Sequence, residues 1–181
     1  MITSTTRFKK FSFMTAKVVS ATSLVAFSFS VNAGTATSNL SATATATVAA
    51  NCTISSSAVA FGVYDPMVAN KTANLDATGT VTVTCTSGST GTITLGQGVN
   101  PATGSTASIP LRQMAASTDR LSYDLYSDTA RSVVWADTSA TGVARNCTGA
   151  ADAVTVYVRV PANQNVPAGS YVDTVVATVT F

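Results

Sequence analysis

The feature that most constrains the fold is an alternation of apolar and polar residues that recurs along the chain. The last stretch, GSYVDTVVATVTF, places Val175, Ala177, Val179 and Phe181 on one face of an extended strand. No segment after the N-terminal one sustains the apolar period of about 3.6 residues that is typical of a helix. Strands rich in β-branched and aromatic residues are predicted over 41–48, 58–63, 79–85, 91–96, 120–127, 132–137, 153–160 and 170–181.

Turn-forming residues separate these segments, in stretches such as TSGSTG, GQGVNPATGS and VPANQNVPAGS. Many short strands joined by such turns are typical of an antiparallel β-sandwich. We therefore predict an all-β fold of about seven or eight strands, with no domain boundary or internal repeat within residues 34–181. Trp135, Tyr123 and Leu125 are expected to lie in its core.

The N-terminal segment has the three parts of a secretory signal peptide in their usual order. Four basic residues between Arg7 and Lys17 precede the apolar run VVSATSLVAFSFSV, and the small residues of VNA end at Ala33. The run is shorter than the roughly 20 residues that a membrane span needs. We therefore predict a signal peptide over residues 1–33 and an exported chain with no membrane span after cleavage.

Removal of the signal changes the net charge of the chain from +2 to −2, because four of the 10 basic residues lie in the signal and all 8 acidic residues lie after it. No basic patch remains, which argues against a nucleic-acid partner. Charged residues make up 10% of the chain, against roughly 25% in ordinary soluble domains. Thr, Ser and Ala take their place, and such a surface suits a protein that stacks against copies of itself.

The residues that most enzymes need are missing. The chain has no His and no Glu, which removes His-dependent triads, Cys–His pairs and the usual zinc ligand sets. Asp124 and Asp128 are close in sequence, but strand geometry does not direct both into one cleft. We predict no catalytic residue, no cofactor and no metal centre; a loose Ca²⁺ site at Asp119, Asp124 or Asp137 stays open.

Three cysteines allow one intramolecular disulfide and leave one thiol over. Export places them in an oxidising compartment, where disulfides form and persist. Cys52 and Cys85 lie within or beside the strand-like segments ANCTI and TVTVTC, so we predict that they pair. Cys147 lies in the loop-like stretch ARNCTGAAD, where it is either free or paired between molecules.

A second long alternation, NLSATATATV, begins a few residues after the predicted cleavage site. One reading is a first strand that pairs within its own domain, and the other is an extension that inserts into a neighbouring subunit. Burial of its Leu or Val stabilises by about 1.5–3 kcal/mol each, and of each Ala methyl by only about 0.8 kcal/mol. The extension therefore holds a neighbour only if it is long and fully paired.

An ordered set of segments resembles the spore coat U domain family, which includes subunits of Csu-type, or archaic, chaperone–usher pili. The segments are NCTISSSAVAFGVYDP, GTVTVTCTSG, TITLGQG, LRQMA, LSYDLYSDTARSVVW and VRVPANQNVPAGSYVDTVVATVTF. The resemblance spans essentially the whole exported chain. It implies an incomplete immunoglobulin-like sandwich that lacks its last strand and is completed by a donor strand. A periplasmic chaperone supplies that strand first, and the next subunit replaces it at the outer-membrane usher.

The resemblance also implies roles for particular residues. The pilin domain maps to 49–181 and the donor segment to 34–48, and the family's disulfide matches Cys52 and Cys85. The expected donor face consists of Leu40, Ala42, Ala44, Ala46 and Val48, and is mostly Ala where larger aliphatic residues are usual. The expected acceptor cleft and chaperone-binding strand present Tyr171, Val175, Ala177, Val179 and Phe181.

The function that the resemblance implies is that of a structural subunit in a surface pilus or fibre, which supports adhesion and biofilm formation. Such a subunit is exported to the periplasm of a Gram-negative bacterium and then to the cell surface. Its partners are the chaperone, the usher and neighbouring pilin subunits, in a homo- or hetero-polymer. The alternatives are a tip adhesin that binds a surface or glycan, a spore or cell coat protein, and a monomer that closes its own sandwich.

Overall fold

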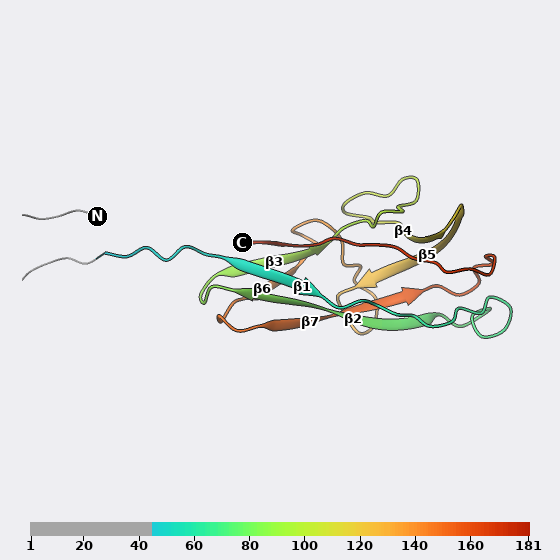
Figure 1. Ribbon diagram of the computed structural model, residues 1–181, viewed down its shortest axis with the longest axis horizontal. Coiled ribbons are helices and arrows are strands. Elements are labelled where there is room, and N and C mark those ends of the chain that lie inside the picture. Colours follow the sequence, from blue (N-terminus) through green and yellow to red (C-terminus); the bar gives the residue numbers. More distant parts are fainter. Residues whose placement is uncertain (1–44) are drawn as a thin grey trace, which may run out of the picture. The chain divides into compact units, whose positions relative to one another are not determined.

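The structure, a computed structural model, describes residues 45–181, and all regular structure within them is β (Figure 1). The predicted signal peptide and the expected donor residues Leu40, Ala42 and Ala44 lie outside this range. The all-β prediction is confirmed. The strands are β1 (Cys52–Ser56), β2 (Leu75–Cys85), β3 (Thr90–Leu95), β4 (Arg112–Ala116), β5 (Asp119–Tyr126), β6 (Val143–Asn146), β7 (Asp152–Val160) and β8 (Ala177–Thr180).

The strands form two antiparallel sheets. The five-stranded sheet has the order β1-β2-β7-β5-β4, and the three-stranded sheet has the order β6-β3-β8. The two longest strands, β2 and β7, pair along most of their length, with Val81 opposite Val154 and Gly79 opposite Val156. Their alternating valines point to one side, because successive side chains of a strand face opposite ways. This apolar face packs against Ile93 and Leu95 of β3, and the two layers of side chains together form the core.

Trp135 lies fully buried in this core, as expected, together with Tyr123 and Leu125. The indole Nε1–H donates a hydrogen bond of 2.9 Å to the carbonyl oxygen of Ile93, and the backbone N–H donates one of 2.8 Å to Leu125. Trp135 therefore links the two sheets through polar as well as apolar contacts, since Ile93 and Leu125 belong to different sheets.

Three predicted strands differ from the structure. No strand forms over 58–63, and 132–137 contributes only an isolated bridge between Val134 and Tyr126. Residues 45–48, the described part of the strand predicted over 41–48, are exposed and outside any ladder. Residues 45–48 and 58–63 join no ladder, whereas the backbone of 132–137 forms single hydrogen bonds with Leu95, Leu125 and Ser127 without a continuous ladder.

The C-terminal strand is shorter than predicted, and three strands lie outside the predicted ranges; β1 is one of them, although its first residues belong to the strand-like segment ANCTI. Regular pairing at the C-terminus is limited to β8, preceded by a bridge between Val172 and Ala115. β4 was missed because its inner face carries Arg112, which is 1% exposed, beside Met114. β6 was missed because it is four residues long and lies in a stretch that resembles a turn.

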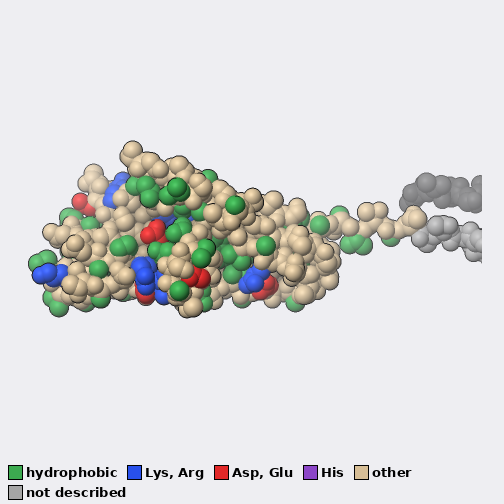
Figure 2. Space-filling model, turned by 180° about the vertical axis from the view of Figure 1, so that it is seen from behind, with side chains coloured by type: hydrophobic (Ala, Val, Ile, Leu, Met, Phe, Trp, Pro, Cys, Tyr) green, Lys and Arg blue, Asp and Glu red, His purple; other side chains and the backbone are tan. Residues whose placement is uncertain are grey.

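The surface of the described residues carries few charges. Figure 2 shows one face on which uncharged polar side chains and backbone predominate between scattered Arg and Asp residues. Asp76 forms the best-defined ion pair, with Arg159 at 2.8 Å and Arg131 at 3.4 Å. No helix in this part of the chain is long and apolar enough to cross a membrane.

Candidate strand-acceptor groove

A groove of about 1090 Å³ opens directly onto the core. One rim is the segment after β1, residues 56–66, and the other is the segment before and into β8, residues 166–177. Its floor therefore consists of core side chains that no strand of the described residues covers. The floor residues are Leu95, Met114, Leu121, Tyr123, Leu125, Val156, Val158 and Val160.

Two strands that reach the groove only at one end have an unpaired edge: β1 contributes its last residue, Ser56, to the lining, and β8 its first, Ala177. β1 pairs with β2 on one side and β8 pairs with β3 on one side. β1 and β8 lie side by side (Figure 1), yet no hydrogen-bond ladder joins them. Among residues 45–181, therefore, the outer edges of both strands carry backbone N–H and C=O groups without a ladder partner.

The C-terminal rim passes from one sheet to the other. Val172 and Ala115 exchange two backbone hydrogen bonds, of 2.9 and 3.1 Å, which tie the rim to β4. Four residues later the Gly96 N–H donates to the carbonyl of Val176 at 2.9 Å, and β8 then pairs with β3. Since the ends of this segment belong to different sheets, its middle part spans the side on which the sandwich is open.

Asp173 fixes the middle of this rim. Its carboxylate accepts a hydrogen bond of 2.7 Å from the Tyr123 hydroxyl, and bonds of 3.0 Å from the Val99 N–H and the Asn100 side-chain amide. Burial, together with the neighbouring carboxylate, raises the pKa of Tyr123 far above its usual value. The hydroxyl therefore stays protonated and remains a donor to Asp173.

Arg112 is a buried cation that ties the two sheets together. From β4 its guanidinium donates to the carbonyls of Leu95 at 2.7 Å, Gly96 at 2.8 Å and Trp135 at 2.8 Å. Burial lowers the pKa of Arg112 from its usual value. The guanidinium remains the cation in spite of that shift, because arginine does not lose its proton in proteins.

The expected acceptor residues occupy three different environments. Tyr171, Val175 and Ala177 line the groove. Val179 is half-buried against the core, where an added Cβ at Gly91 would lie 3.1 Å from it. Phe181 is 55% exposed at the end of the chain.

The opposite rim carries groove residues that the sequence reasoning did not single out. Val59, Phe61 and Tyr64 line the groove and pack against the core. Gly79 makes room for this rim, because a Cβ there would lie 2.5 Å from the Cγ2 of Val59. The alternation in AVAFGVY was the available signal, but it read as an ordinary core strand.

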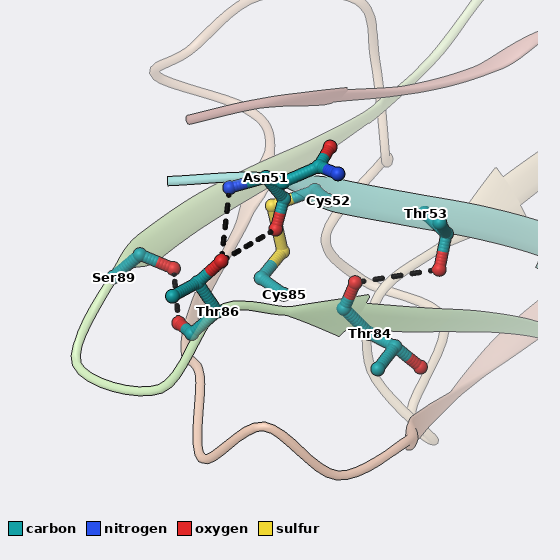
Figure 3. The surroundings of a disulfide bond; sticks show 7 residues. All are labelled: Asn51, Cys52, Thr53, Thr84, Cys85, Thr86 and Ser89. Carbon is teal, nitrogen blue, oxygen red and sulfur yellow. Dashed lines mark hydrogen bonds between the residues drawn. A yellow bond between two sulfur atoms is a disulfide. The ribbon is translucent and has the colours of Figure 1, made fainter. Parts of the chain in front are cut away.

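The N-terminal end of β1 carries the disulfide. Cys52 is bonded to Cys85, the directly opposed residue at the end of β2. Next to it, Asn51 and Thr86 exchange three hydrogen bonds, two of which Figure 3 draws at the Thr86 hydroxyl. Of the expected donor face, Ala46 and Val48 are described; both are exposed, Val48 by 80%.

Comparison with known proteins agrees with this architecture. The family model described as Spore Coat Protein U domain matches residues 19–178. The chain belongs to this family. It is 52% identical over 174 residues to Protein U of Myxococcus xanthus, an alignment that covers 92% of this chain and 96% of that protein.

A solved structure shares the fold of this family member. It is the CsuC–CsuE chaperone–tip adhesion subunit pre-assembly complex from archaic chaperone–usher Csu pili of Acinetobacter baumannii. The likeness has a TM-score of 0.56 at 19% identity and covers 75% of this chain. The chain spans only 40% of the length of the chain that it matches there. At this identity the likeness shows a shared fold, that of a chain in this complex.

Proposed function

We propose that the chain is a structural subunit of a surface pilus or fibre that assembles by donor-strand exchange. The observation that carries this proposal is the groove, whose apolar floor is core and which meets the unpaired edges of β1 and β8 at one end. An extended segment laid in it buries alternate side chains on the floor and can form backbone hydrogen bonds with an unpaired strand edge where the groove meets it. A groove for a compact small molecule does not need two free ladder edges.

The occupant that we propose is the N-terminal segment of a second subunit, residues 34–48. Its described part, residues 45–48, is exposed and outside any ladder of its own chain. The donor face would be Leu40, Ala42, Ala44, Ala46 and Val48. Small alanine side chains contribute little apolar area, so the backbone ladder, at about 0.5–1.5 kcal/mol for each hydrogen bond, supplies a large share of the stabilisation.

The same groove requires an occupant before assembly. We propose that a periplasmic chaperone places a strand along it, and that the N-terminal segment of the next subunit replaces that strand at an outer-membrane usher. The chain would then travel through the periplasm of a Gram-negative bacterium to its surface, where the fibre supports adhesion and biofilm formation. The fold shared with a chaperone–subunit complex supports this route.

A matched pair of substitutions tests the donor assignment. Ala44→Asp places a charge on the proposed donor face, and Thr45→Asp places the same charge on the opposite face. We expect Ala44→Asp to abolish fibres while Thr45→Asp retains them, since only the first would bury an unpaired carboxylate. Fibres are scored by electron microscopy of cells that also produce the chaperone and usher. Normal fibres from Ala44→Asp would refute the donor assignment.

A coat protein is the second candidate. The family description, Spore Coat Protein U domain, names a coat protein, and the relative of 52% identity is Protein U. A coat subunit can use the same joint between copies. Antibody labelling separates the possibilities by location. Label along filaments indicates a shaft subunit, label at filament ends a tip adhesin, and label over resting cells without filaments a coat.

A further inference from the structure

A free thiol lies beside the disulfide. The sulfur atoms of Cys52, Cys85 and Cys147 all lie within 4.8 Å of one another, and Cys147 is unpaired. These are the three cysteines of the chain. A thiol so close to a disulfide is positioned as a nucleophile toward it, because exchange proceeds by attack of a thiolate on a disulfide sulfur.

The backbone holds Cys147 in this place. Cys147 directly follows β6, and its N–H donates to the carbonyl of Ser89 at 2.9 Å. Its own carbonyl accepts a hydrogen bond of 2.9 Å from the Gly88 N–H. Both partners lie in the turn that joins β2, which ends in Cys85, to β3. The proximity of the sulfurs therefore follows from sheet pairing and does not depend on a loose loop.

The neighbouring strand β3 packs closely against the Cys85 sulfur. Gly91 of β3 pairs with Arg145 of β6, two residues before Cys147. A Cβ at Gly91 would lie 3.6 Å from the Cys85 sulfur. The same Cβ would lie 3.1 Å from the Cγ2 of Val179, so glycine at this position lets β3 pack closely against both the Cys85 sulfur and Val179.

We infer that Cys147 exchanges with the Cys52–Cys85 disulfide within the folded chain. The Cys147 thiolate attacks the Cys85 sulfur, a Cys85–Cys147 bond forms, and the Cys52–Cys85 bond breaks. Cys52 leaves as a thiolate and takes a proton from water, which replaces the proton that Cys147 gave to water. One thiol and one disulfide are present before and after the step, so no oxidant or reductant is consumed.

Burial identifies Cys52 as the leaving group. Cys85 is 3% exposed, whereas Cys52 at the start of the edge strand β1 is only half-buried. A thiolate released at Cys85 would be desolvated in the core, which disfavours the charged form. Release at Cys52 places the charge nearer to water, so Cys85 is the sulfur that both disulfides share.

The exchange changes how the N-terminal segment is attached. In the observed pairing, a covalent bond holds Cys52 to β2. After exchange, the β1 ladder and the hydrogen bonds between Asn51 and Thr86 (Figure 3) remain as the attachment at this point. The exchange itself does not depend on the proposed function, and its test uses no fibre.

Trypsin separates the three cysteines. Cleavage after Lys71, Arg112 and Arg145 places Cys52 on a peptide that ends at Lys71, Cys85 on 72–112 and Cys147 on 146–159. The full exported chain is incubated at about pH 8, where a fraction of an ordinary thiol is ionised. It is then denatured in acid, alkylated with a maleimide, digested and analysed by mass spectrometry.

We expect two linked products from the wild-type chain, one joining the Cys52 and Cys85 peptides and one joining the Cys85 and Cys147 peptides. We also expect alkylated Cys52 to appear as alkylated Cys147 decreases. Cys52→Ser has no disulfide to exchange, so it is first incubated with oxidised glutathione, which accepts the two electrons and two protons of the Cys85 and Cys147 thiols; it should then give a monomer whose Cys85 and Cys147 peptides are linked. Cys147→Ser should retain the Cys52–Cys85 link alone.

Two results would overturn the inference. One is a wild-type chain that retains only the Cys52–Cys85 link, with Cys147 fully alkylated. The other is a Cys52→Ser chain in which, after the incubation with oxidised glutathione, Cys85 and Cys147 are both alkylated or are linked only between molecules. The wild-type map decides the question even if Cys52→Ser does not fold.

Discussion

Replacing Arg112 with Met tests whether the buried guanidinium holds the two sheets together. The substitution preserves much of the apolar stem but removes donors to the carbonyls of Leu95, Gly96 and Trp135. Leaving each carbonyl without a partner costs about 1–3 kcal/mol. The variant no longer has to bury a cation, which offsets a few kcal/mol of this cost. We therefore expect the free energy of unfolding to fall by roughly 2–5 kcal/mol.

The assay is urea unfolding of the exported chain. With a slope of about 2 kcal/mol/M, the expected loss lowers the midpoint by roughly 1–2.5 M. Arg120→Met is the matched control, because Arg120 is exposed and bonds only to carbonyls of its own turn. It should shift the free energy of unfolding by no more than about 0.5 kcal/mol. Equal midpoints for Arg112→Met and the wild type would refute the role assigned to Arg112.

Two further variants test the rim and an ion pair. Gly79→Ala should destabilise the fold by roughly 1–3 kcal/mol through the clash with Val59. Adding Val59→Ala should recover part of that loss. Additive effects of the two substitutions in a double-mutant cycle would contradict the contact. The hydrogen bond from Arg159 holds the pKa of Asp76 below its usual value. Its stabilisation is therefore present above the unfolded pKa, near about 4, and is lost as pH falls through the folded value. Asp76→Asn should lower the free energy of unfolding by about 1 kcal/mol or less at about pH 7, and by a smaller amount at about pH 2. An equal decrease at both pH values would contradict the assignment.

The strands that the sequence predicted well are those that bury one face in the core. Apolar residues recur at every second position in the segments that became β2, β3, β5 and β7, and burial follows the same alternation in β2, β5 and β7. β4 was not predicted because Arg112 occupies an inward position, and a cation in a sequence normally indicates a surface residue. Its burial depends on three carbonyls from other segments, which no local pattern reveals.

The groove was predicted on one rim only. Alternation in the C-terminal stretch indicated the inward positions Val175 and Ala177, which the structure places in the groove. Val59 and Phe61 alternate in the same way and read as a paired strand, yet their backbone joins no ladder. Alternation reports which side chains are buried, but pairing depends on the space beside the backbone, and that is a property of the whole fold.

The two strand edges beside the groove have a consequence for production of the protein. Natural sheet edges are protected from pairing with other chains by Lys, Pro or bulges, but β1 (CTISS) and β8 (ATVT) contain no charged residue and no proline. Chains that meet before those edges are occupied can therefore join edge to edge in unproductive registers. Yield should then depend on the concentration of unaccompanied chains and on the time that they spend alone, more than on the stability of the fold itself.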